Sequence, residues 1–221
     1  MSELAKELTT ILDKVGSILP SNSISIQESG KDAKLTELQL SSEHYELENL
    51  PSAVLCKELW KGRHRNDFDC DGIVLMTDPV GKETQLLLVE LKSVLTWNQL
   101  QKAIRQIVIS LLKIHGHFSL CKSYTGTWPS VKVLICCSAD NVDGARLKNQ
   151  SIADDGKLSK IDKIYRALLT RPGERTLITL SDILTGTNCL PSNCLQPSLL
   201  GIPLEIQLLD SHGAPVLKHQ V

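Results

Sequence analysis

Two short apolar runs in residues 71–92 limit the possible folds of this chain more than any other feature. The runs are GIVLM and QLLLVEL, and the segment DPVGK between them has the Pro and Gly of a turn. Strands that are apolar on both faces are typical of the centre of a sheet that is covered on both sides. The sequence therefore predicts an antiparallel hairpin at the centre of an α/β fold.

Three charged residues interrupt this hairpin, and all lie at its open end: Asp71, Glu90 and Lys92. With the turn centred between residues 80 and 81, the register places Asp71 about opposite Glu90, and Lys92 points to the same face as Glu90. Cross-strand carboxylates with Cβ atoms about 5 Å apart repel one another unless a positive group lies between them. Mg²⁺ takes one or two protein carboxylates and completes its shell with water and phosphate oxygens.

The elements after the hairpin also form a pattern. Thr96 and Gln99 match the T-x-x-Q capping box, and a helix is predicted from there to about residue 115. A strand is predicted at 131–138 (VKVLICCS). A strand, a helix and a second strand in this order imply a right-handed parallel crossover.

An Asp, a hairpin ending in Glu-x-Lys, a helix and a strand resemble the PD-(D/E)XK nuclease superfamily. That superfamily includes restriction endonucleases, Holliday-junction resolvases and RecB-type nucleases. Asp71 lies at the family's Asp position and Glu90-Leu91-Lys92 at its E-x-K, whereas Cys70 replaces the family's Pro. The resemblance covers residues 52–138, under half of the chain.

The resemblance implies an α/β fold with a restriction-endonuclease-like core, in which helices flank a central mixed sheet. An additional C-terminal α+β extension belongs to the same domain. The expected division is an N-terminal helix and hairpin (1–50), the nuclease-like core (51–138) and the extension (139–221).

The resemblance also implies roles for the charged residues. Asp71 and Glu90 would hold Mg²⁺ (or Mn²⁺), and the Leu91 carbonyl would be a further ligand. Lys92 would orient the attacking water and stabilise the transition state. This role is favoured over that of a general base, because two neighbouring carboxylates stabilise the charged ammonium.

Two further residues are candidates by resemblance. Members of the superfamily often carry a Glu on the helix before the Asp strand, and Glu58 in a predicted helix at 51–60 matches that position loosely. An exposed helix acid is the alternative interpretation of Glu58. Members also place a Gln or Lys on the later helix near the scissile phosphate. Gln99, in the first turn, is preferred there to Gln106, and both can equally be exposed helix glutamines.

A short basic run precedes the Asp strand. It supplies candidate phosphate contacts, because positive groups beside a negative pocket are needed to position a phosphodiester. A solvated loop is the alternative interpretation of the run. The residues of this nucleic-acid-binding set are Lys57, Lys61, Arg63, His64 and Arg65.

Other metal sites fit less well. Residues 67–72 (DFDCDG) match the start of an EF-hand loop, but the twelfth position is Asp78 and Pro79 follows it. Asp69 is a second-ranked alternative to Asp71 as a metal ligand. Cys189 and Cys194 match no common zinc spacing, and the cysteines are expected to be thiols.

The composition and the absence of certain motifs exclude several classes of function. A net charge of −1 and 4% aromatic residues argue against a broad nucleic-acid surface. No signal peptide and no run of 18 apolar residues is present, so we expect a cytoplasmic protein that does not enter a membrane. P-loop, G-x-S-x-G and H-E-x-x-H motifs are absent.

The expected function is a metal-dependent nuclease that hydrolyses nucleic acid, with DNA preferred to RNA as the substrate. A small basic patch suits an effector in defence or DNA processing that a helicase, ATPase or sensor subunit recruits, and a homodimer is plausible by resemblance. The alternative is a non-catalytic interaction subunit with a nuclease-like fold.

The remaining elements are less constrained. A helix is expected at 2–19, a polar helix at 42–49, and a closing hairpin at 204–217. Strands at 23–28 and 34–40 form a hairpin that either extends the central sheet or stands apart from it. The third strand of the core is expected from the region before Asp67 or from this hairpin.

Overall fold

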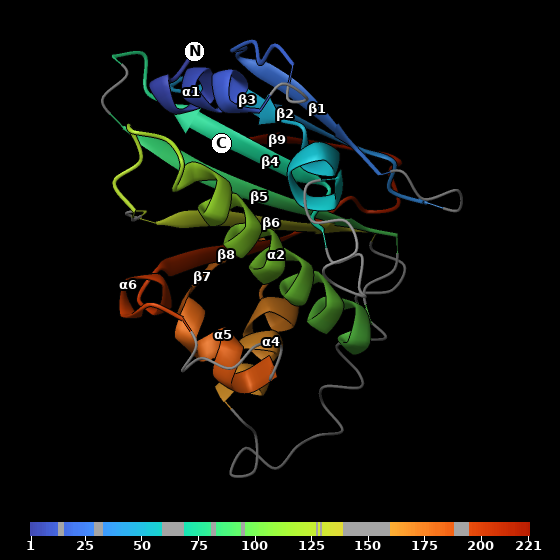
Figure 1. Ribbon diagram of the computed structural model, residues 1–221. Coiled ribbons are helices and arrows are strands. Elements are labelled where there is room, and N and C mark those ends of the chain that lie inside the picture. The colour runs from blue at the N-terminus through green and yellow to red at the C-terminus, as the bar shows by residue number, and fades with distance from the viewer. Residues whose placement is uncertain are drawn as a thin grey trace.

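The computed structural model describes residues 1–12, 16–28, 33–58, 69–80, 83–93, 96–126, 128, 130–138, 160–187 and 195–221. The chain is an α/β protein with a six-stranded mixed sheet, a three-stranded sheet and flanking helices (Figure 1). Among the described residues, no helix combines the length and the apolar character needed to span a membrane.

The larger sheet has the order β3-β4-β5-β6-β8-β7. Its first three strands are antiparallel, β5, β6 and β8 are parallel, and β7 pairs antiparallel with β8. The predicted hairpin is β4 and β5, and the predicted parallel crossover joins β5 to β6. The strands are β3 (Glu46–Leu50), β4 (Gly72–Thr77), β5 (Thr84–Lys92), β6 (Val131–Cys137), β7 (Arg175–Thr179) and β8 (Pro203–Asp210).

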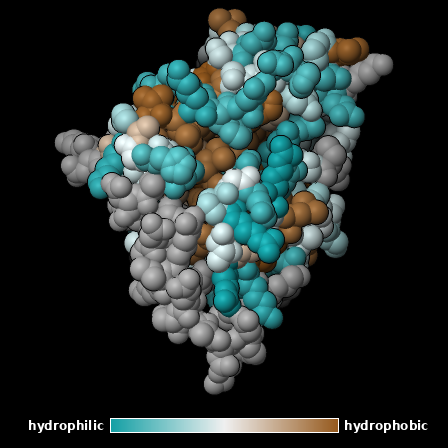
Figure 2. All heavy atoms as spheres, turned by 180° about the vertical axis from the view of Figure 1, so that it is seen from behind, coloured by the Kyte–Doolittle hydropathy of each residue, from teal (hydrophilic) through white to brown (hydrophobic). Residues whose placement is uncertain are grey.

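The smaller sheet is a separate layer rather than an extension of the larger one. Its strands are β1 (Ser23–Gln27), β2 (Glu37–Ser41) and β9 (Val216–Gln220), in the order β1-β2-β9. Ile26 and Leu38 of this sheet pack with Val74 and Val89 of the larger sheet in one apolar cluster. Seen from behind (Figure 2), hydrophilic side chains surround hydrophobic ones that show near the middle of the face.

Helices cover the other face of the larger sheet (Figure 1). Thr96 caps the long helix α2 as predicted, because its Oγ1 accepts a hydrogen bond from the Gln99 amide at 3.2 Å. The helical elements are α1 (Glu3–Ile11), the π-helical turn η2 (Ala53–Glu58), α2 (Trp97–Phe118), α4 (Lys160–Thr170), α5 (Leu180–Thr187) and α6 (Pro197–Leu200).

Two predicted elements were wrong. The polar helix expected at 42–49 is replaced by β3, which pairs with β4 and is the missing third strand of the core. The closing hairpin expected at 204–217 does not form, because β8 pairs with β6 in the larger sheet while β9 pairs with β2 in the smaller one. The turn between them reverses through His212 and Gly213, which have φ values of 50° and 82°. In addition, α1 ends at Ile11, before the predicted end at residue 19.

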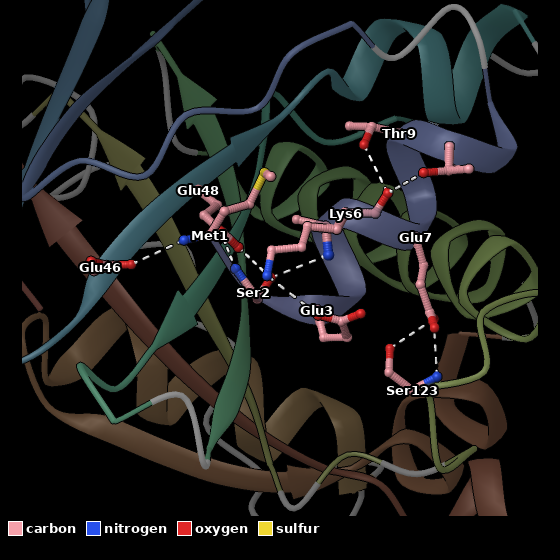
Figure 3. A network of polar contacts seen from close by, with 11 residues as sticks. Met1, Ser2, Glu3, Lys6, Glu7, Thr9, Glu46, Glu48 and Ser123 are labelled. Carbon is pink, nitrogen blue, oxygen red and sulfur yellow. Dashed lines mark hydrogen bonds and ion pairs between the residues drawn. The ribbon is translucent and has the colours of Figure 1, made fainter.

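Helix α1 is docked on β3 by a polar network (Figure 3). The carboxylate of Glu48 is fully buried and accepts hydrogen bonds from the backbone amide and the hydroxyl of Ser2. The Ser2 hydroxyl also caps the helix by accepting from the Ala5 amide at 3.2 Å. The middle of α1 is held where Glu7 accepts hydrogen bonds from the amide and hydroxyl of Ser123. The segment predicted to be a polar helix therefore contains an acid, Glu48, that is buried in a strand.

A buried polar stripe runs along α2 within its otherwise apolar inner face. Its members are spaced by four, three and four residues, so they lie on one side of the helix. Each of them is less than 10% exposed. They are Gln106, Ser110, Lys113 and His117.

The stripe binds two neighbouring chain segments. The Gln106 amide donates to the Asp69 carbonyl at 2.9 Å, and the Ser110 hydroxyl accepts from the Cys70 amide at 2.8 Å. Lys113 forms an ion pair with the Asp69 carboxylate at 2.5 Å and donates to the Cys56 carbonyl at 2.9 Å. These contacts place the residues that lead into β4 against α2.

The Lys113–Asp69 ion pair is the first test of this arrangement. Replacing Lys113 by Met leaves the Asp69 carboxylate buried without its counter-ion, so Lys113→Met should lower the free energy of unfolding by about 3–5 kcal/mol. The neutral double variant Asp69→Asn/Lys113→Met should lose less, because no buried charge remains. Urea unfolding measures both values. A single-variant loss below about 1 kcal/mol would show that the pair behaves like a surface pair.

Candidate active site

The β4–β5 register brings the predicted acids together. Gly72 lies opposite Val89, so the next pair along the hairpin is Asp71 and Glu90, as predicted. Side chains alternate along β5, and Leu88 belongs to the cluster on the α2 side of the sheet. The side chains of Glu90 and Lys92 therefore project toward α2.

Glu90 is an unusual residue for a central strand. Its side chain is 0% exposed, and its Oε1 accepts from the Lys92 ammonium. Within the described part of the chain, no hydrogen-bond partner reaches its Oε2. Burial, and then the charge of Asp71, raise the pKa of Glu90 to about 8 against the opposing effect of Lys92. The residue is a buried carboxyl group with one unused acceptor oxygen.

Asp71 lies at the point where β4 begins, and its side chain is half-buried. Its Oδ2 accepts from the backbone amide of Leu91 at 2.7 Å. That contact holds the Asp71 carboxylate against the backbone of β5 at Leu91, the residue between Glu90 and Lys92. The hydroxyl of Ser52 donates to the Asp71 carbonyl at 3.2 Å and helps to fix the backbone there.

Lys92 is held between two side chains. Its ammonium contacts Glu90 and donates to Gln106 Oε1 at 3.0 Å, and the side chain is 13% exposed. Gln106 is oriented for this by its own donation to the Asp69 carbonyl. The residues of the E-x-K motif thus belong to the same network as the polar stripe of α2.

The glutamine on Lys92 is not the one that sequence reasoning preferred. Gln99 is half-buried in the first turn of α2, where its amide is used by the cap, whereas Gln106 lies two turns later at the site. Their spacing of seven residues places both on one helix face. The helical spacing therefore identified Gln106 as a candidate. It could not show which turn of α2 lies against Lys92, because that depends on how the helix packs on the sheet.

Asp69, the alternative metal ligand, forms an ion pair with Lys113 instead. Its carboxylate is 4% exposed and paired with Lys113. Cys70, at the family's Pro position, is buried with its amide on Ser110 and its thiol donating to the Gly72 carbonyl at 3.3 Å. Burial raises the pKa of the Cys70 thiol. Both residues anchor the start of β4 and leave Asp71 as the acid beside Glu90.

Most of the predicted nucleic-acid contacts lie outside the described residues. Lys61, Arg63, His64 and Arg65 fall in the segment 59–68, which is not described. Lys57 and Glu58 are the last residues of η2, and their side chains also lie outside the described part. Their roles in binding phosphate or metal therefore stay predictions.

The described residues fit a divalent cation through two acids rather than through a larger cluster. None of them form a group of three or more His, Cys, Asp or Glu side chains that could hold a metal ion. The pair Asp71 and Glu90 nevertheless fits an ion that takes two carboxylates and fills its remaining positions with water. The unused Glu90 Oε2 favours this fit, because a buried carboxylate oxygen without a partner is costly unless a cation or a donor meets it.

Comparison with known proteins adds no relative. No protein-family model, no curated protein and no solved structure matches this sequence significantly. The interpretation of the site therefore depends on its own residues.

The pKa of Glu90 predicts how stability depends on pH. Between the ordinary value of 4.5 and about 8, the unfolded chain releases the proton that the folded chain keeps. Without metal, the wild type should lose stability as the pH rises through this range. The stability of Glu90→Gln relative to wild type should grow between pH 5 and pH 9, by up to about 5 kcal/mol.

Urea unfolding in EDTA at pH 5, 7 and 9 measures this difference. Glu37→Gln is the matched control, because hydrogen bonds from Gln39 and Ser25 lower the pKa of Glu37, so its stability relative to wild type should change little between pH 5 and pH 9. A difference between Glu90→Gln and wild type that is constant with pH would mean that Glu90 is ionised in the folded chain.

Proposed function

We propose that this chain is a metal-dependent phosphodiesterase of the PD-(D/E)XK type that hydrolyses nucleic acid, DNA rather than RNA. The observation that supports it most is the buried Glu90 carboxylate, which has an unused oxygen next to Asp71 and a lysine on its other oxygen. A strand that needed only to fold would carry an apolar side chain at this position.

Asp71 and Glu90 would hold Mg²⁺ or Mn²⁺, with the Leu91 carbonyl as a further ligand by resemblance. When bound, such an ion lowers the pKa of a coordinated water and neutralises charge that develops on the phosphate. The contact between Asp71 Oδ2 and the Leu91 amide keeps this acid close to Leu91 before any ion binds. Preorganisation of this kind reduces the cost of assembling the site.

Lys92 supplies a positive charge at the same place. Its ammonium is held by Glu90 and Gln106, so it would reach a phosphate oxygen or the attacking water with little loss of side-chain freedom. A fixed cation that faces developing negative charge stabilises the transition state. We assign Lys92 to orientation and electrostatic stabilisation rather than to proton abstraction.

The proposed nuclease also has a proposed partner and cellular location. A net charge of −1 suits a nuclease that a protein partner brings to its substrate, and we place it in the cytoplasm, in defence or DNA processing. The basic run at residues 57–65 would supply the phosphate contacts. The alternative is a non-catalytic interaction subunit of the same fold, and the tests below distinguish it from the nuclease.

Cleavage and metal binding test the proposal together. Labelled single- and double-stranded DNA and RNA are incubated with the protein in Mg²⁺, Mn²⁺ or EDTA. Cutting should require metal and should fall by about 100-fold or more in Glu90→Gln and in Lys92→Met. Calorimetry should show Mn²⁺ binding that is lost in Glu90→Gln and retained in Lys92→Met, because Glu90 is a proposed ligand and Lys92 is not.

The control is Lys102→Met, which removes an exposed lysine from α2 and should leave both readouts unchanged. Cutting in EDTA, or equal cutting by Glu90→Gln, would contradict the assignment of the site. An absence of Mn²⁺ binding to the wild type would favour the interaction subunit.

A further inference from the structure

The hairpin of the smaller sheet reaches the end of the larger sheet where the site lies. Ser21, before β1, is bridged to Leu47, which pairs with Met76 at the far end of β4. At the opposite end of the hairpin, the Lys34 amide donates to the hydroxyl of Ser93 at 2.7 Å. Ser93 directly follows Lys92, so β1 runs toward the site.

The ladder of this hairpin sets the direction of Glu28. The Glu28 amide donates to the Thr36 carbonyl at 3.0 Å, so the antiparallel pairing continues through Glu28. Ile26, two residues earlier, packs against the larger sheet directly on Gly72, where an added Cβ would lie 2.5 Å from its Cδ1. Residues two apart in a strand share a face and lie about 7 Å apart. The half-buried side chain of Glu28 therefore projects beyond Gly72, toward Asp71.

The two described residues directly before Asp71 face away from the hairpin. Asp69 and Cys70 turn toward α2, to which Gln106, Ser110 and Lys113 bind them. Asp71 is thus approached from the α2 side by Glu90 and from the smaller-sheet side by the end of β1.

The hairpin thus brings Glu28 to a site that has room for a ligand. Among the described residues, no hydrogen-bond partner reaches the fully buried Oε2 of Glu90. Because the described acids do not form a three-ligand group, Glu28 lies outside direct ligand range of an ion held by the other two.

We propose that Glu28 is a positioning residue of the metal site, which accepts a hydrogen bond from a water molecule bound to the ion held by Asp71 and Glu90. This inference rests on the proposed function. It assigns the site a third acid from a separate sheet, so that the β1–β2 hairpin is part of the site rather than only a cover for the core. Carboxylates that bind the waters of a metal ion orient its shell and strengthen binding.

The test is Mn²⁺ calorimetry of the full chain at fixed pH and salt. Glu28→Gln should weaken Mn²⁺ binding by about 10- to 100-fold while the melting temperature of the metal-free protein stays close to wild type. Glu37→Gln is the matched control, because it removes an acid from the same hairpin whose partners are Ser25 and Gln39. Its affinity for Mn²⁺ should equal that of the wild type.

Glu28→Asp separates positioning from charge. It keeps the negative charge but withdraws the carboxylate by one carbon, so a positioning role predicts weaker binding in this variant too. Wild-type affinity in Glu28→Asp, or equal affinities in Glu28→Gln and Glu37→Gln, would overturn the proposal and leave the proposed function standing. If the wild type binds no Mn²⁺, both fail together.

Discussion

The burial of the Glu90 side chain on a central strand is the constraint to which the surrounding polar groups respond. Placing an acid on a central strand, with no exposure to water, is unfavourable unless its oxygens are satisfied. Lys92 satisfies one oxygen and the other is unmet among the described residues. Burial, and then the charge of Asp71, raise the pKa of Glu90, and Lys92 opposes them only in part. The burial of Glu90 therefore costs stability, and in the proposed function a bound cation would offset that cost.

Helix α2 turns this local arrangement into a rigid one. A helix that only covered the sheet would be apolar along its whole inner face, but α2 carries a buried row of hydrogen-bonding side chains. Gln106 meets Lys92, Ser110 and Lys113 meet the start of β4, and His117 bonds with the Leu55 carbonyl at 2.9 Å. Buried polar networks with satisfied partners specify one arrangement of the elements that they join. The strands that supply Asp71 and Lys92 are therefore located by a common support.

The central hairpin, its register and the cap of α2 could be predicted because each depends on local sequence. The turn after Asp78 sets which residue faces Glu90, and Thr96 caps α2 whatever the rest of the chain does. Strand β3 was missed because its acids suggested solvent, whereas one of them, Glu48, is buried by Ser2, which lies far away in sequence.

The other errors have the same physical origin. The partner of β9 is β2, nearly 180 residues earlier, and no turn near residue 212 reveals it. Gln106 was ranked below Gln99, because the crossing of α2 over β5 follows from packing and not from the helix pattern. Glu28 was not considered as a site residue, since the position of its hairpin against Gly72 depends on one sheet stacking on another. Long-range contacts of this kind leave no periodic signal in the sequence.

The central claim is that the unused oxygen of Glu90 belongs to a metal site. Crystals soaked in Mn²⁺ would test it most directly through an anomalous difference map. The account predicts a strong peak within ligand distance of Glu90 Oε2 and of the Asp71 carboxylate. A map without a peak there, in crystals where Oε2 instead bonds to a protein group or to an ordered water, would contradict it.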